Sequence, residues 1–97
     1  MKISQVTDAF LCSFIREDAT DTEVITLLGA IKPAALAYLT QHTGLTAEEL
    51  DDREDVTYVY LAAVEQMYDN RTLTVDEGKL SYLAATILSL HSKNNIG

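Results

Sequence analysis

The spacing of apolar residues along the 97-residue chain predicts four helical segments. In each segment apolar side chains recur every three or four residues, which is the period of one face of an α-helix. The expected helices cover about residues 5–16, 22–43, 55–69 and 76–92, and a further helical turn is expected at 47–50. The pattern therefore predicts an all-α fold: one small domain, residues 1–97, of about four helices with long central helices packed as a bundle.

Local signals predict where these helices begin and end. Ser4 is the expected N-cap of the first helix and Thr46 of the short turn, because a side-chain oxygen there can accept a backbone N–H. Gly44 suits the left-handed position that ends the second helix. Pro33 lies inside that helix and is expected to kink or split it. The tail, residues 93–97, is expected to fray.

The third helix has apolar residues on two sides. One arc is suited to the core and contains Val56, Val59, Tyr60, Ala63, Val64 and Met67. Tyr58, Leu61 and Tyr68 project from the opposite side, around Glu65. Other helices of the same protomer could cover this second stripe, or a neighbouring subunit could, since Tyr is a favoured interface residue. The pattern leaves both open, and the predicted oligomer interface consists of Tyr58, Leu61, Glu65, Tyr68 and Arg71.

The charge balance is acidic, with 15 Asp and Glu against 7 Lys and Arg and a net charge of −8. No two basic residues are adjacent, which argues against tight binding to nucleic acid or to an anionic membrane. No apolar run is expected to approach the roughly 20 residues of a membrane span, and no secretory signal is recognised. The single Cys12 cannot form an internal disulfide. These features predict a cytosolic protein without a membrane partner.

The candidates for chemistry are few. His42 and His91 lie on apolar helix arcs without the spacing of a metal site, so each is expected to be a satisfied, partly buried histidine. Cys12 is expected to pack inertly. We expect no cofactor and no enzymatic activity, since no catalytic motif is recognised. A run of carboxylates is expected to form a solvated connector, with a lumen or a partner surface as the functional alternative: Glu48, Glu49, Asp51, Asp52, Glu54 and Asp55.

The residues Tyr68-Asp69-Asn70-Arg71 are expected to end the third helix and to have a structural rather than a chemical role. Asn70 tolerates the left-handed conformation that ends a helix. Arg71 can pair with the terminal carbonyls, and Tyr68 can pack beside them. Alternatively, Arg71 bridges to an acidic group of a neighbouring subunit.

Four motifs in order resemble those of the phage head–tail connector (head-completion adaptor) family, which is also common in prophages. These are Phe14-Ile15-Arg16-Glu17-Asp18, Tyr38 to Gly44, Met67-Tyr68-Asp69-Asn70-Arg71, and Ile87 to Asn94. The matching family positions are Tyr68, Asn70, Arg71, His91, Ser92 and Asn94. The sequence departs from the family pattern in its short acidic connector and in Pro33.

The resemblance implies an all-helical structural protein that forms a homo-oligomeric ring, a dodecamer in the virion, below the portal. Its partners would be the portal protein and tail or head-completion proteins. DNA would pass through the ring without tight binding, which acidic walls favour. The protein would be found in the host bacterial cytoplasm during assembly and then at the virion head–tail junction. The alternative function is a small helical adaptor or regulatory protein that binds a partner through the Tyr58, Leu61 and Tyr68 stripe.

Overall fold

The computed structural model of the protein describes residues 1–92, and these form helices and connectors without a β-strand. The α-helices are α1 (Asp8–Phe14), α2 (Thr22–Thr43), α3 (Ala47–Asp51), α4 (Val56–Asn70) and α5 (Tyr82–Leu90). Two short 3₁₀ helices, η1 (Ile3–Gln5) and η2 (Glu77–Lys79), complete the described chain. The predicted all-α class is confirmed.

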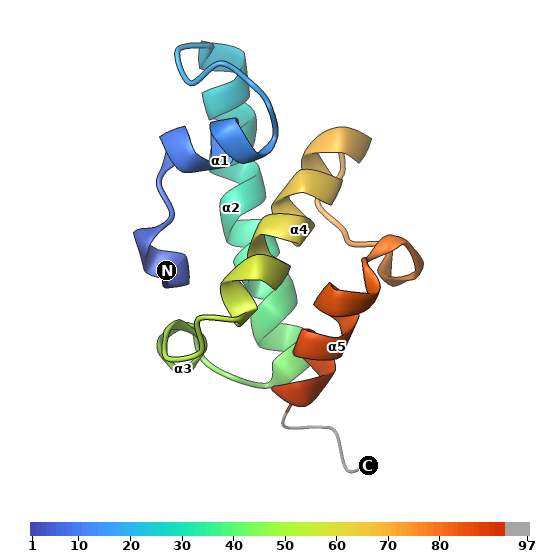
Figure 1. Ribbon diagram of the computed structural model, residues 1–97. Helices are drawn as coiled ribbons and strands as arrows, with labels where there is room; N and C mark the ends of the chain where they lie inside the picture. Colours follow the sequence, from blue (N-terminus) through green and yellow to red (C-terminus); the bar gives the residue numbers. More distant parts are fainter. Residues whose placement is uncertain (93–97) are drawn as a thin grey trace.

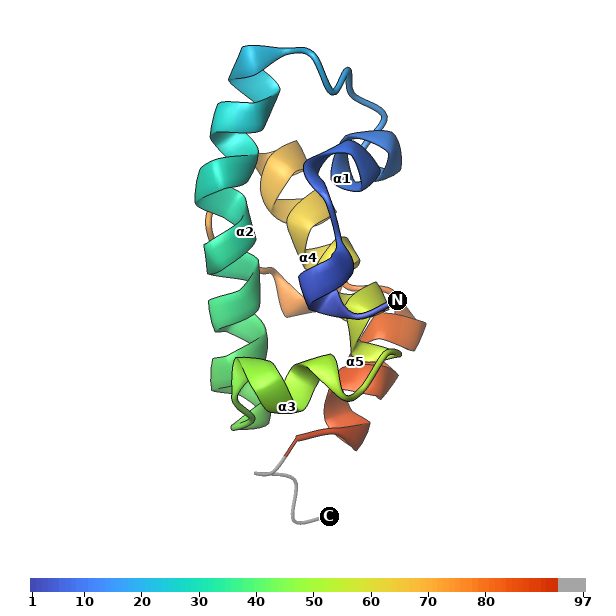
Figure 2. The ribbon, with the colours of Figure 1, turned by 90° about the vertical axis from the view of Figure 1, so that its left-hand side faces the viewer.

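Helices α2 and α4 form the centre of the molecule and run in opposite directions (Figure 1). η1 and α1 pack on one side of α4, and α5 packs on the other (Figures 1 and 2). The core arc predicted on α4 is confirmed, since all six of its residues are buried: Val56, Val59, Tyr60, Ala63, Val64 and Met67. Leu28 and Leu39 of α2 are fully buried as well. Each fully buried side chain of this kind stabilises the fold by about 1.5–3 kcal/mol.

The predicted ends of α2 are confirmed, but the predicted break within it is wrong. The Asp21 side chain caps the helix by accepting the Glu23 N–H at 2.9 Å. Gly44 ends it with a left-handed φ of 75°. Pro33 lies inside the helix without splitting it. Pro33 and Gly29 are both exposed, so water can solvate the Gly29 carbonyl that the missing proline N–H leaves unpaired.

The first helix begins later than predicted. Thr7, not Ser4, is its N-cap and accepts the Phe10 N–H at 3.1 Å. Ser4 lies in η1 and donates its backbone N–H to Asp51 at 3.0 Å. Phe10 of this helix is 38% exposed. The helix ends where Arg16 adopts a left-handed φ of 63°.

The last helix is also shorter than predicted, because the chain forms two separate turns after residue 75. Asp76 accepts the Gly78 N–H at 3.0 Å and caps η2 instead of α5. Leu80 is extended, and Ser81 then caps α5 by accepting the Ala84 N–H at 3.1 Å. Side chains such as Asp and Ser compete with helical hydrogen bonds in this way. We call residues 72–92 the C-terminal arm.

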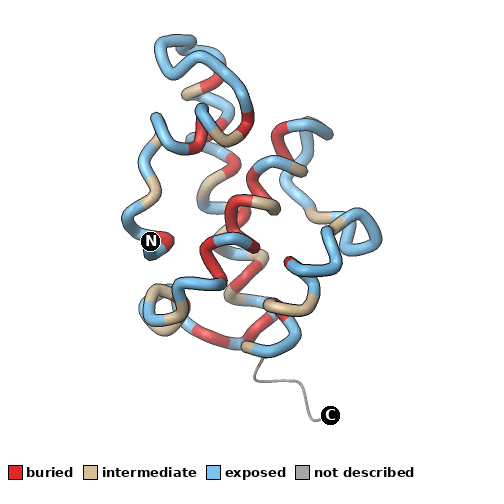
Figure 3. The backbone as a smooth tube through the Cα atoms, in the orientation of Figure 1, coloured by how far each residue is buried: buried red, intermediate tan, exposed pale blue. Residues whose placement is uncertain are grey.

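Burial differs sharply between α4 and the C-terminal arm (Figure 3). Nine of the 15 residues of α4 are buried. In α5 only Ala84 and Leu88 are buried. Tyr82, Leu83 and Leu90 are 88%, 56% and 73% exposed. The arm therefore leaves much of its apolar surface in solvent.

Helix α2 is the one helix in residues 1–92 whose length and composition would allow it to cross a membrane. This finding corrects the expectation that no stretch approaches that length. The evidence for a span is weak, because a core helix of a globular domain meets the same criterion. Here Leu28, Ala35 and Leu39 of α2 are fully buried in the core.

Candidate functional site

The second stripe predicted on α4 divides into a buried part and an exposed part. Leu61 and Tyr68 are 8% and 5% exposed, on a helix that η1 and α1 contact. For these two residues the cover comes from within the protomer, which corrects the expectation that they project toward a neighbouring subunit. Tyr58 is 36% exposed and Glu65 is exposed. Of the four predicted interface residues on α4, only these two remain on its surface.

The Tyr68-Asp69-Asn70-Arg71 motif closes α4 and connects it to the end of α1. Arg71, not Asn70, takes the left-handed conformation, with a φ of 52°. Its guanidinium donates to the Tyr68 carbonyl and lies 4.3 Å from the centre of the Tyr68 ring. The Tyr68 hydroxyl hydrogen-bonds the Glu17 carboxylate, and burial together with this carboxylate raises the pKa of Tyr68. The predicted pairing of Arg71 with a terminal carbonyl is confirmed.

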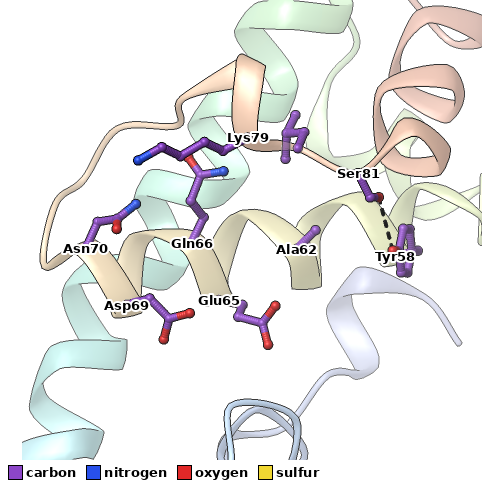
Figure 4. Close-up of a pocket in the computed structure, with 9 residues that line it drawn as sticks. Tyr58, Ala62, Glu65, Gln66, Asp69, Asn70, Lys79 and Ser81 are labelled. Carbon is purple, nitrogen blue, oxygen red and sulfur yellow. Dashed lines mark hydrogen bonds between the residues drawn. The ribbon is translucent and has the colours of Figure 1, made fainter.

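A cleft of about 320 Å³ separates α4 from the C-terminal arm (Figure 4). Its lining comes from one face of α4 and from the segment before α5: Tyr58, Ala62, Glu65, Gln66, Asp69, Asn70, Lys79, Leu80 and Ser81. The Tyr58 hydroxyl and the Ser81 hydroxyl are 3.2 Å apart and close one end. Gln66 donates to the Asp76 carbonyl at 3.2 Å and accepts the Asp76 N–H, which fixes the arm beside α4.

The cleft offers polar groups rather than a recognisable reaction centre. Glu65 and Asp69 lie one helical turn apart on one edge of α4, whereas Lys79 extends from the arm toward Gln66 and Asn70 (Figure 4). In residues 1–92 no cluster of three or more His, Cys, Asp or Glu side chains could hold a metal ion. Cys12 is buried, and burial followed by the nearby Asp8 charge raises the pKa of its thiol. A thiol in that environment behaves as a packing group, as predicted.

Both histidines pair with carboxylates and fasten the C-terminal arm to the body. His42 Nδ1 lies 3.1 Å from a Glu77 oxygen, and its side chain is 38% exposed, more than predicted. The Tyr38 hydroxyl donates to the same Glu77 carboxylate at 3.2 Å. His91 Nε2 lies 2.8 Å from Asp55, at the N-terminus of α4, and its side chain is 23% exposed. The expectation that both histidines are satisfied is confirmed.

The acidic connector is a structured element as well as a solvated one. It forms α3, and Thr46 caps this helix as predicted by accepting the Glu49 N–H at 3.2 Å. The Glu49 side chain accepts the Thr46 N–H at 3.1 Å in return, which completes a capping box. Asp51 accepts the Ser4 N–H, Glu54 pairs with the Met1 ammonium at 2.6 Å, and Asp55 pairs with His91. Glu48 and Asp52 are exposed. A lumen or partner role for this group stays a prediction.

An exposed apolar surface on α5 was not predicted from the sequence. It consists of Tyr82, Leu83 and Leu90 on α5, and we call it the α5 stripe. The signal was present, because no charged residue occurs between Lys79 and His91. A solvent-facing helix normally carries charged residues on its outer face.

Of the remaining family-motif residues, His91 pairs with Asp55, and Ser92 donates to the His42 carbonyl at 3.3 Å. Asn94 lies outside the described residues. Comparison of the chain with family models, curated proteins and solved structures found no match.

Proposed function

We propose that this chain is a structural protein of the phage head–tail connector type, which assembles into a ring below the portal and forms part of the DNA passage and the tail-attachment surface. The observation that carries the proposal is the ordered series of four motifs, above all Tyr68-Asp69-Asn70-Arg71.

The geometry of that motif supports a structural role for it. Arg71 lies over the Tyr68 ring, and Tyr68 bonds to Glu17 of the connector between α1 and α2. Tyr68 and Arg71 therefore connect the end of α4 to the segment after α1, as an assembly of rigid protomers would need. Positioned, mutually satisfied groups of this kind rigidify a fold.

Two surface properties support assembly around a polyanion. The α5 stripe leaves apolar side chains uncovered, and such patches mark interaction sites. The net charge of −8 disfavours retention of DNA phosphates on a channel wall. A partner-binding adaptor would also use the α5 stripe, but it would not need the family motif series.

The test is assembly with and without the portal protein encoded in the same phage or prophage genome. We expect closed rings in negative-stain images, and light scattering should report a mass many times that of the 10.7 kDa protomer when portal protein is present. A chain that stays monomeric and unbound with portal protein in excess would overturn the proposal and favour the adaptor. Mixing with an unrelated phage's portal protein controls for nonspecific adhesion.

A further inference from the structure

Helix α5 is apolar around most of its circumference. At about 100° per residue, the buried Ala84 and Leu88 lie on one side and the α5 stripe lies on another. Thr86 lies between the stripe residues, Ile87 lies next to them, and the small residues Ala85 and Ser89 occupy the arc on the other side. A helix that is apolar on two sides is normally covered on both. Within residues 1–92 the second side of α5 is uncovered.

A second apolar surface lies elsewhere on the same chain and is recessed. Leu27, Ile31, Met67 and Leu73 line a cleft of about 250 Å³ between α2 and the end of α4, which we call the α2–α4 recess. Leu27 and Leu73 at its rim are 36% and 55% exposed. The recess lies at the end of α4, whereas α5 lies beside the start of α4 (Figure 1).

We propose that the α5 stripe of one copy docks into the α2–α4 recess of the next copy, so that subunits join head to tail. The inference rests on the proposed ring function and specifies which two faces of the protomer meet. A contact between two different faces is what ring closure requires, because each subunit then offers one face in each direction.

Charge does not oppose a second copy at these surfaces. Each chain carries a net charge of −8, so a contact between copies must avoid opposing carboxylates. The α5 stripe has no charged residue, and the recess has one, Arg71. These are therefore surfaces on which two acidic copies can approach without opposing their carboxylates.

The exposed area fits a weak pairwise contact. The α5 stripe exposes on the order of 400 Å², given the 150–250 Å² that an aromatic side chain can bury. A contact with the recess then buries roughly 800 Å² in total, below the roughly 1,200–2,000 Å² of stable interfaces. A symmetric contact between two α5 helices would bury a similar area but would leave the recess open and stop at a dimer. The head-to-tail contact instead gives each subunit two weak interfaces that a closed ring combines.

The experiment compares two double variants by sedimentation velocity, alone and mixed. The stripe variant is Tyr82→Ser with Leu90→Ser, and the recess variant is Leu27→Ser with Leu73→Ser. All four positions are exposed, so circular dichroism should show native helix content for both. Wild-type protein at up to about 1 mM should associate beyond a dimer, and each variant alone should self-associate about tenfold or more weakly. An equimolar mixture should form a heterodimer, because the stripe variant keeps its recess and the recess variant keeps its stripe.

Three results would overturn this inference: a wild-type chain that is monomeric at about 1 mM, variants that associate like wild type, or a recess variant that dimerises alone through α5. The proposed function fails separately. If both variants still form rings on portal protein, the faces are wrong and the connector proposal stands. If head-to-tail association occurs without any binding to portal protein, the faces are right and the connector proposal fails.

Discussion

The α2–α4 pair and the C-terminal arm are joined to the fold by different kinds of interaction. The α2–α4 pair is held by fully buried apolar side chains such as Leu28 and Met67. The arm contributes only Ala84 and Leu88 to the buried core. Val75, Leu80 and Ile87 pack against the core but are only partly buried. Polar pairs at the surface, including His91 with Asp55, add to these attachments.

The difference matters because these interactions contribute unequal free energies. A buried leucine stabilises a fold by a few kcal/mol, whereas an exposed ion pair contributes about 0–1 kcal/mol. We therefore expect the α2–α4 pair to set the global stability and the arm to open first. Proteins draw their binding elements from segments that open locally at a low free-energy cost. The α5 stripe lies on such a segment.

The largest expected effect is the contrast between Leu28→Ala in α2 and Leu88→Ala in α5. Leu28 is fully buried in α2, so its truncation should lower the free energy of unfolding by about 2–5 kcal/mol. Leu88→Ala should lower the global free energy of unfolding by less, because Leu88 is the main apolar anchor of the arm and not of the α2–α4 pair. Urea unfolding measures the global loss, and hydrogen exchange should show faster α5 amides with α4 amides unchanged.

Equal global losses for the two variants, with no selective change in α5 exchange, would contradict this division. The arm would then unfold together with the α2–α4 pair as one cooperative unit.

A smaller contrast is expected between two helix caps, in each of which a side-chain oxygen accepts a backbone N–H. Asp21 caps α2 and Ser81 caps α5, and removal of either side chain by alanine should cost about 1 kcal/mol. Asp21→Ala should lower the global midpoint in urea. Ser81→Ala should instead raise exchange within α5, because it also removes the partner of Tyr58.

Ser81→Thr is the matched control, since threonine keeps the oxygen that accepts the Ala84 N–H. If Ser81→Thr disturbs α5 as much as Ser81→Ala does, the effect comes from packing and not from the cap.

The ends of α2 could be predicted because the chemistry is local. Asp21 and Gly44 act on backbone groups within a few residues of themselves. The start of α5 could not be predicted in the same way, because Asp76 and Ser81 can both cap a helix. Gln66, ten residues before Asp76, holds the Asp76 backbone beside α4, and this contact between distant segments selects Ser81.

The candidate interface shows the same limit. Helical periodicity placed Tyr58, Leu61 and Tyr68 opposite the core arc, but it gave no information on which neighbour covers them. The packing of η1 and α1 decides that Leu61 and Tyr68 are internal. The exposed face of α5 was detectable from its lack of charge, and only the burial of Ala84 and Leu88 shows which side faces outward.

The smallest expected effect concerns Tyr38, which reports directly on contact between the two regions. Burial, then the charge and hydrogen bond of Glu77, raises the pKa of Tyr38 to about 12. In the unfolded chain a tyrosine loses its proton near pH 10, so between about pH 10 and 12 only the unfolded state is deprotonated at this residue. Deprotonation there favours unfolding, and the stabilisation present below pH 10 is lost as the pH rises through this window.

Phenolate absorbance should therefore show a titration step near pH 12 that is lost in Tyr38→Phe. Glu77→Gln should lower that midpoint only in part, because burial by α2 and the arm persists. Leu88→Ala should also lower the Tyr38 midpoint if loss of Leu88 releases the arm. Glu77 and the arm residues that bury Tyr38 would then move away from it together. A midpoint near 10 in wild type would mean that the arm does not rest on α2 in solution, and an unchanged midpoint in Leu88→Ala would mean that polar pairs alone hold it there.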